Sequence, residues 1–442
     1  MTTKKEILDV LKTIMDPDFN KDIVSLGFVK NVQIDAGDVS FDIALTTPAC
    51  PVKSDFQKKA ETVVGKLKGV DSVKVNITTL PQREYSSLSS PQDALKNVRS
   101  IVAVSSCKGG VGKSTIAAHL AFELAQRGFD VGLVDVDIHG PSIPTLFNLQ
   151  KATVSTNQNK QFVPVLKDNL RIMSFGFLLG DSPAVMRGPI VSRYVQQILL
   201  NTAWGKLDYL FIDMPPGTGD VQLTITQTIR LSGAVIVTTP QTLSLLDVAR
   251  GILMFEKVSV SVLGLIENMA FYECDNCHKK HYIFGQNTSQ SLKSRFGIET
   301  LAEIPLCAQF LKGIDESKDN NIIKQAVDLV IRALGKMSIQ QKDVPNIYCD
   351  ENQVRFMWTD GTTLTVNNRD LRLSCRCALC IHELTGEHLL KDKDIRPDIA
   401  AKKIIPLGNY AVGIDWNDGH ASGIYPFKAI KLIADSKNSK KT

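Results

Sequence analysis

The pattern of apolar and polar positions changes character twice along this chain of 442 residues. In the first stretch, residues 26–34 and 39–45 alternate between apolar and polar side chains on either side of a turn around Gly37. Alternation with a period of two places every second side chain on the same face of a strand. The two runs therefore predict a β-hairpin.

Helices are expected on both sides of this hairpin. The first is marked by three apolar residues that fall on one helical face: Ile7, Leu11 and Ile14. Residues 53–67 predict a second helix, and residues 70–78 predict a further strand. These elements together indicate a small α+β domain over residues 1–88, followed by a polar, proline-containing linker over residues 80–97.

The middle of the chain is built from short, continuous runs of apolar residues, separated by helical stretches such as residues 114–128. Strands that are apolar on both sides are typical of a parallel sheet with helices on both faces. We therefore predict an α/β domain with a central parallel sheet over residues 98–338. The runs cover residues 101–106, 130–137, 207–215, 233–240 and 262–269.

Alternation returns in the last part of the chain, on both sides of a turn at residues 359–361. This pattern predicts a small β-rich domain over residues 345–436. The alternating apolar residues are Val354, Phe356, Trp358, Leu364 and Val366.

Composition excludes several classes of partner. The chain has Lys+Arg 51 against Asp+Glu 46 and no basic block before its last few residues, so nucleic acid is not expected. No apolar run reaches the roughly 18 residues that cross a bilayer, so no membrane partner is expected. Glu6 and Asp9 interrupt the first apolar stretch, which is not typical of a secretory leader. The clustering of five of the nine cysteines indicates metal ligands in a reducing compartment, and hence a cytoplasmic location.

The segment "SSCKGGVGKST", residues 105–115, lies between a predicted buried strand and a predicted helix, which is the context of a phosphate-binding loop. Glycines let backbone N–H groups surround phosphate oxygens, and the helix N-terminus adds positive potential. Lys113 would reach the β- and γ-phosphates of ATP, and the Ser114 hydroxyl would bind Mg²⁺. The residues expected to hold ATP are Lys108, Gly109, Gly110, Val111, Gly112, Lys113, Ser114 and Thr115.

Two residues of this segment depart from the ordinary loop. Cys107 replaces its first glycine, and Lys108 is an additional lysine. This arrangement resembles the deviant phosphate loop of the ParA/MinD and nitrogenase-iron-protein superfamily. The resemblance implies that Lys108 crosses a dimer interface to the phosphates of the partner subunit and takes part in catalysis. It therefore implies a homodimeric ATPase.

Three aspartates follow predicted strands of the same domain. Asp135 and Asp137 stand two residues apart at the end of one run, so the period of a strand would place them on the same side. Asp213 ends another run, at the place of a Walker B acid that supports Mg²⁺. We expect Asp135 and Asp213 to complete the Mg²⁺ site with Ser114. The resemblance implies that Asp137 orients the attacking water and that Asn268 reads the adenine.

The segment "ECDNCH", residues 273–278, raises three alternatives. Cys274 and Cys277 have the spacing of a zinc knuckle, of a covalent c-type haem, or of half of an iron–sulfur site. His278 and His281 would supply enough further ligands for zinc within one chain. Haem is disfavoured because it is attached outside the cytosol.

The motifs "DVDIHGPSIP", "MRGP", "WGKLDYLFIDMPPGTGD", "ENM" and "FYECDNC…IFG" together resemble the Mrp/ApbC family of ATP-dependent Fe–S cluster carriers over residues 98–338. Residues 1–88, with "TTPACP" around Cys50, resemble the Fe–S-assembly domain often fused to that family. The domain order is similar to the chloroplast high-chlorophyll-fluorescence branch. The resemblance implies that Cys274 and Cys277 hold half of a 4Fe–4S cluster and that a second subunit supplies two more thiolates. It also implies two kinds of partner, the recipient apoproteins that receive the cluster and Fe–S assembly factors.

Three further cysteines lie within six residues in the segment "CRCALC", and His420 follows an Asp-Gly turn. Three thiolates and one imidazole make a closed tetrahedral zinc site, so we predict Zn²⁺ bound by Cys375, Cys377, Cys380 and His420. The two segments also resemble the N-terminal zinc module of γ-butyrobetaine hydroxylases. His382 and His388 are alternatives for the fourth ligand, and a second Fe–S site is an alternative to zinc.

The leading hypothesis is thus a homodimeric ATPase that carries a labile 4Fe–4S cluster. Two alternatives are a MinD/ParA-like positioning ATPase and an electron-transfer ATPase like the nitrogenase iron protein. The positioning ATPase would leave Cys274 and Cys277 without a role. The order of these cysteines after "ENM" favours the carrier over electron transfer.

Overall fold

The computed structural model describes most of the chain, in two compact units. One unit contains residues 1–252, 262–289 and 299–336, and the other contains residues 253–261, 290–298 and 337–442. The predicted linker falls almost entirely within residues 80–94, which lie outside the described residues. The described residues are 2–79, 95–179, 188–285, 292–306, 313–314, 321–340, 345–375, 380 and 389–438, except 218, 230, 259, 294–295, 359–360, 408–410 and 421–422.

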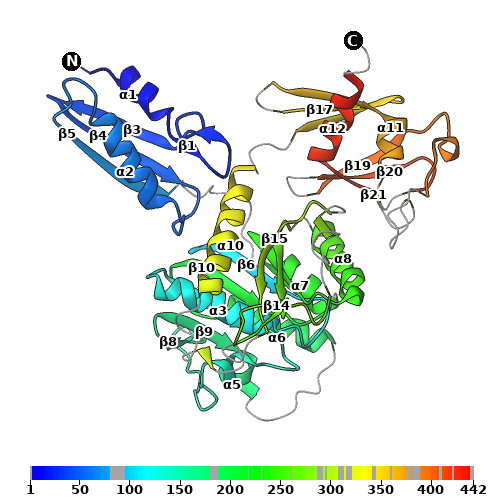
Figure 1. The fold of residues 1–442 in the computed structure, drawn as a ribbon. Coiled ribbons are helices and arrows are strands. Elements are labelled where there is room, and N and C mark those ends of the chain that lie inside the picture. Colours follow the sequence, from blue (N-terminus) through cyan, green and yellow to red (C-terminus); the bar gives the residue numbers. More distant parts are fainter. Residues whose placement is uncertain are drawn as a thin grey trace. The chain divides into compact units, whose positions relative to one another are not determined.

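The amino-terminal elements form a three-stranded sheet with two helices (Figure 1). The predicted hairpin is confirmed, because β3 (Val29–Asp35) pairs antiparallel with β4 (Asp38–Leu45). β5 (Ser72–Thr79) then pairs parallel with β4, after the crossover helix α2 (Lys53–Val64), which ends three residues earlier than predicted. Helix α1 (Lys4–Leu11) begins with a capping box between Thr3 and Glu6. The short pair β1 (Met15–Asp16) and β2 (Lys21–Asp22) follows it.

An eight-stranded sheet forms the centre of the first unit, in the order β15-β12-β11-β6-β10-β7-β9-β8. All neighbouring pairs are parallel except β8 with β9, so the predicted parallel sheet has one antiparallel edge strand. The five runs predicted as strands are all strands, whereas three others were not predicted. The strands are β6 (Val98–Ser105), β7 (Val131–Asp135), β8 (Val165–Lys167), β9 (Leu170–Ser174), β10 (Leu207–Asp213), β11 (Gly233–Thr238), β12 (Val262–Asn268) and β15 (Thr300–Ile304).

Helices surround this sheet (Figure 1). Every residue of β7, β11 and β12 is buried, which explains their continuous apolar sequences. Since β6 lies between β10 and β11, the chain reverses its direction of winding there, and the carboxyl ends of these strands meet at one edge. The helices are α3 (Lys113–Gln126), α4 (Ile143–Leu146), α5 (Phe175–Leu179), α6 (Gly188–Leu200), α7 (Asp220–Thr228), α8 (Thr242–Lys257) and α10 (Asn321–Gln340).

The second unit contains two antiparallel three-stranded sheets with a shared core. The predicted alternation is confirmed at Val354 and Phe356, which are both fully buried. Helix α12 (Phe427–Asn438) was not predicted. The other elements are β16 (Asn346–Cys349), β17 (Gln353–Met357), β18 (Thr363–Asn367), α11 (Asn368–Leu373), the 3₁₀ helix Asp392–Asp394, β19 (Ala401–Leu407), β20 (Ala411–Trp416) and β21 (Gly423–Pro426).

None of the described helices combines the length and the hydropathy that a membrane span requires. The fold class is α/β, as the sequence predicts, with a mixed and mostly parallel sheet as its centre.

Candidate nucleotide and metal sites

The predicted phosphate loop connects β6 to the first residue of α3. Gly110 and Gly112 have φ of 78° and 82°, in the left-handed region that favours glycine. A Cβ on Gly112 would also overlap the side-chain amide of Asn268. That amide donates a hydrogen bond to the carbonyl oxygen of Val111 at 2.9 Å. Asn268 therefore supports the loop from the carboxyl end of β12.

Lys113 forms a buried ion pair with Asp213 at the carboxyl end of β10. Its Nζ donates to Asp213 Oδ1 at 2.5 Å and lies 3.2 Å from the hydroxyl of Ser114. The second carboxylate oxygen, Oδ2, is buried and has no hydrogen-bond partner among the described residues. An orphaned buried acceptor beside a hydroxyl fits a cation with oxygen ligands, or one of its bound waters.

Asp135 lies directly across from Asp213, because the two residues are register partners in β7 and β10. It is fully buried and accepts hydrogen bonds from the backbone N–H groups of Asp137 (3.1 Å) and Ile143 (3.3 Å) and from the hydroxyl of Ser174 (3.0 Å). Burial raises the pKa of Asp135, as does the charge of Asp213, while Lys113 opposes the shift. The structure thus brings Lys113, Asp135 and Asp213 together at one sheet edge.

Strand β7 ends at Asp135, so the alternation of a strand does not fix the direction of the Asp137 side chain. The backbone N–H of Asp137 donates a hydrogen bond to the Asp135 carboxylate. Asp137 is partly exposed beside the buried carboxylates, a position open to water.

The additional lysine of the loop points away from the buried ion pair. Lys108 Nζ donates a hydrogen bond to Gln241 Oε1 at 2.9 Å. Gln241 immediately precedes α8 and was not predicted from the sequence, since a single glutamine at a helix start carries no signal of its own.

Cys274 and Cys277 lie at the tip of a small hairpin, formed by β13 (Tyr272–Glu273) and β14 (Lys280–His281). Hydrogen bonds from the backbone N–H groups of Cys277 and Asn276 lower the pKa of the Cys274 thiol. Such donors stabilise a thiolate, which is the form that binds metal. The tip therefore presents two thiols near the surface, and the thiolate form of Cys274 is favoured over its usual extent.

The histidines that could complete a zinc knuckle do not gather around this pair. His278 has a φ of 53°, and its Nδ1 lies 3.0 Å from Glu273 Oε1. Within the described part of the chain, the metal-binding side chains that cluster in threes are Cys375, Cys380 and His420 alone. The geometry around Cys274 and Cys277 thus favours half of a site over a complete one.

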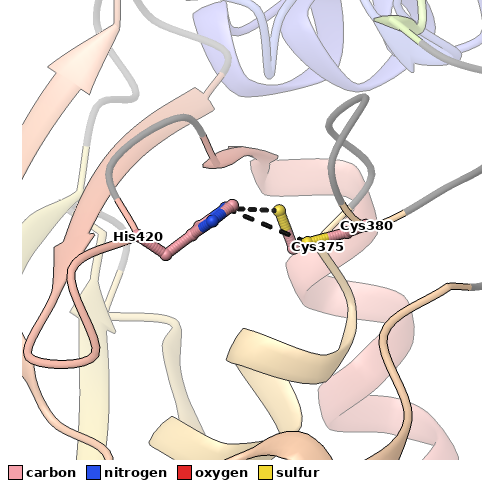
Figure 2. Close-up of side chains that lie close together, drawn as sticks. All are labelled: Cys375, Cys380 and His420. Carbon is pink, nitrogen blue, oxygen red and sulfur yellow. Dashed lines mark hydrogen bonds between the residues drawn. The ribbon is translucent and has the colours of Figure 1, made fainter.

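The second unit brings Cys375, Cys380 and His420 together, as the sequence predicts (Figure 2). Cys375 follows α11, and His420 lies in the turn between β20 and β21. His420 Nε2 is 3.3 Å from Cys375 Sγ and 4.0 Å from Cys380 Sγ. Both thiols are buried, so solvent has little access to an ion held there. Cys377, His382 and His388 lie outside the described residues.

An ion pair that the sequence analysis missed holds this cluster together. The buried guanidinium of Arg372 donates to Cys380 Sγ at 3.4 Å and to Asp418 Oδ2 at 2.8 Å. Asp418 Oδ1 accepts the backbone N–H of His420 at 3.0 Å. Arg372 thereby links the cysteine segment to the histidine turn.

Three family models match successive parts of the chain. The NUBPL iron-transfer P-loop NTPase family model, of the ParA group, matches residues 97–337, more than half of the chain. The chain belongs to this family. Two more family models match, an iron-sulfur cluster assembly protein over residues 4–77 and the N-terminal γ-butyrobetaine hydroxylase-like domain over residues 347–431. The three resemblances drawn from the sequence are thereby confirmed.

Relatives of this NTPase include a protein that is named as chloroplastic. The chain is 40% identical to "Fe-S cluster assembly factor HCF101, chloroplastic" of Arabidopsis thaliana, over 98% of this chain and 83% of that relative. It is 42% identical to "Iron-sulfur cluster carrier protein" of Synechocystis, over 72% of this chain and 90% of that relative. A nucleotide-binding protein of Archaeoglobus fulgidus, solved with ADP, is 39% identical, with a TM-score of 0.46 over 54% of this chain and 91% of that chain.

The cysteine in the phosphate loop of this NTPase has a packing role. Burial raises the pKa of the Cys107 thiol to about 11, so it is protonated at neutral pH. A Cβ on Gly251 of α8 would overlap Cys107 Sγ. The thiol of Cys107 thus packs between the loop and α8. No sequence motif predicts this contact.

Gly112→Ala should abolish ATP binding and lower stability, because a methyl group there would displace Asn268 from the loop. Gly128→Ala is the matched control. Gly128 also has a left-handed φ, of 86°, but nothing lies within 4 Å of its Cβ position. Both changes add strain of roughly 1–2 kcal/mol. Calorimetry should therefore detect ATP binding by Gly128→Ala and none by Gly112→Ala. Normal binding by Gly112→Ala would contradict this account of the loop.

Proposed function

We propose that this chain is an ATPase that carries a 4Fe–4S cluster between two copies of itself and transfers it to recipient apoproteins. The observation that carries the proposal is the pair Cys274 and Cys277 at the tip of a hairpin, the first half-buried and the second exposed, with no third ligand gathered beside them in the described chain. A 4Fe–4S cluster takes four cysteines. Two hairpins related by a two-fold axis would supply them.

ATP would bind at the loop between β6 and α3. Lys113 would neutralise the β- and γ-phosphates, and Ser114, Asp135 and Asp213 would hold Mg²⁺ and its waters. The orphaned oxygen of Asp213 supports this assignment. When ATP binds, Lys113 would pair with its phosphates instead of with Asp213. The carboxylate would then be free to face the metal.

Hydrolysis would require two further side chains. Asp137 is partly exposed beside the buried carboxylates, where it could orient the attacking water. Lys108 would contact the phosphates of the partner subunit and stabilise the charge that develops during transfer. In this proposal, the release of Lys108 from Gln241 accompanies dimer formation, which couples ATP turnover to the state of the shared cluster.

The second unit would hold a structural zinc ion, bound by Cys375, Cys377, Cys380 and His420. The cluster of two buried thiols and one imidazole fits such an ion, and Arg372 offsets part of the negative charge of the thiolates. Zinc holds the ends of α11 and the β20–β21 turn together when bound. A closed set of four ligands leaves no position for a substrate, so the role is stabilising.

The compartment stays a prediction. The sequence predicts a cytoplasmic protein, whereas the Arabidopsis relative is named as chloroplastic. A positioning ATPase would leave the pair Cys274 and Cys277 without a role.

Cys274→Ser and Cys277→Ser should each abolish the reconstitution of a cluster at about four irons per dimer, since each subunit then supplies one thiolate and the dimer supplies two of the four ligands. The measurement is iron and sulfide content with the anaerobic absorption spectrum. Cys349→Ser, at another exposed cysteine, is the control and should keep the cluster. An unchanged spectrum in either hairpin variant would refute the bridging site.

Lys108→Ala should retain ATP binding and lose hydrolysis by roughly 100-fold or more, as expected when one donor to a developing charge is removed. Lys113→Ala should lose both binding and hydrolysis. The two variants are compared by nucleotide titration and by phosphate release under the same conditions. Wild-type hydrolysis by Lys108→Ala would show that the lysine has no role across an interface.

His420→Ala should lower the zinc content of the full-length protein and the unfolding temperature of its second unit, because structural zinc contributes roughly 10–16 kcal/mol of apparent binding energy in small domains. His281→Ala, on the exposed hairpin, is the control and should change neither quantity. One tightly held zinc per chain in the His420→Ala variant would assign the fourth position to another residue.

A further inference from the structure

The segment "TTPACP", residues 46–51, is a motif that the proposed function leaves without a role. It follows β4 and leads into α2. Thr47 and Ala49 are buried, and Cys50 is partly buried. The segment lies against the NTPase body, by which we mean the eight-stranded sheet and its helices. Both sides of this contact belong to the first compact unit.

A tyrosine of the central sheet holds the segment from one side. Tyr209, the third residue of β10, is fully buried, and its hydroxyl accepts a hydrogen bond from the backbone N–H of Ala49 at 3.3 Å. The same hydroxyl is hydrogen-bonded to the side chain of Thr47. A buried hydroxyl requires such partners, and residues of the segment supply them here.

Helix α10 contacts the same region from another side. A Cβ on Gly335 would come within 2.6 Å of the Thr46 hydroxyl, so the helix and the segment touch at this glycine. Lys336 Nζ lies 3.2 Å from Asp18 Oδ1, and Arg332 Nε lies 4.0 Å from Asp18 Oδ2. The three helix residues are within four positions of one another and share one face of α10.

The amino-terminal elements also have a core of their own. Buried apolar residues from α1, β4 and α2 form it, among them Ile7, Leu11, Phe41, Phe56 and Val64. An interface between parts that each have a core resembles a transient interface between proteins. The contact with the NTPase body can therefore open while both cores stay intact.

The contact is also incompletely packed and partly accessible to salt. A small cavity remains in it, lined on one side by Asp16 and Cys50 and on the other by Arg332. The side chains of the ion pair between Asp18 and Lys336 are 16% and 41% exposed. Ion pairs that reach solvent are weak and are screened by salt.

We propose that this contact is a latch that closes off the thiol of Cys50, and that the thiol becomes reactive when the latch opens. Burial raises the pKa of Cys50 in the closed form, and the charges of Asp16 and Asp18 raise it further. A protonated, partly buried thiol is a poor nucleophile. Opening would expose the thiol to solvent and relieve the effect of burial. The inference does not depend on the cluster site at Cys274 and Cys277.

Gly335→Ala tests the latch without removing a contact. The methyl group would press against Thr46, whereas alanine itself favours the helix. Alkylation of Cys50 by iodoacetamide in the full-length protein should become roughly tenfold faster, as overpacking of this kind shifts the equilibrium toward the open form. Gly140→Ala is the control, because nothing lies within 4 Å of its Cβ position, and should leave the rate unchanged.

Two further variants address the polar contacts. Tyr209→Phe keeps the ring and removes the acceptor of the Ala49 N–H, so it should also accelerate alkylation of Cys50. Lys336→Glu places a second negative charge beside Asp18 and should do the same, whereas Lys58→Glu, at an exposed lysine of α2, should not. In the wild-type protein, added salt should accelerate the reaction.

Peptide mass spectrometry measures the alkylation of each cysteine separately. Cys349, which is exposed in the second unit, is the reference within every sample and should react equally in all variants. Hydrogen exchange distinguishes opening from unfolding. The amides of residues 46–51 should exchange faster in the variants, while those of β4 and β6 should keep their protection.

Two results would overturn the inference. Alkylation of Cys50 at the wild-type rate in both Gly335→Ala and Tyr209→Phe would show that the contact does not close off the thiol. Faster alkylation with lost protection in β4 and β6 would show that the contact is a permanent part of the fold. The proposed function is tested separately, by the cluster content of Cys274→Ser and Cys277→Ser.

Discussion

The buried ion pair between Lys113 and Asp213 places two opposite charges where neither would be stable alone. Asp135 adds a second carboxylate beside them, fully buried and held by three hydrogen bonds. Removing one member of such a group leaves an uncompensated buried charge, which is strongly destabilising. The register among β6, β7 and β10 must therefore stay fixed. The residue at which α3 begins must stay fixed relative to these strands. The phosphate loop and the site for Mg²⁺ both depend on that arrangement.

The chain has two kinds of cysteine site, and their surroundings differ in the way that their proposed roles require. Cys274 and Cys277 lie on an exposed hairpin, where backbone N–H groups stabilise a thiolate that a partner can reach. Cys375 and Cys380 are buried in the core of the second unit, next to His420 and Arg372. A cluster that must be handed on needs the first environment, and an ion that stabilises a fold needs the second.

Much of this could be predicted from the sequence because the signals are local. The continuous apolar runs predicted β6, β7, β10, β11 and β12, since a strand buried on both faces has no polar side to interrupt it. The loop, the carboxylates and the clustered cysteines were recognisable by their spacing. Strands β8, β9 and β15 were not predicted, because they are short and their place is set by the neighbours they pair with. The sequence did not show that β7 ends two residues before Asp137.

The sequence by itself determined the types of chemistry, because residue identity and spacing decide which ligands and donors a segment can offer. The tertiary structure decided which groups meet. It set Asn268 against Gly112, Gln241 against Lys108, and Arg372 between Cys380 and Asp418. These contacts join residues from 8 to 156 positions apart. Hydrogen bonds depend on the distance and direction between two groups in space, and separation along the chain carries no information about either.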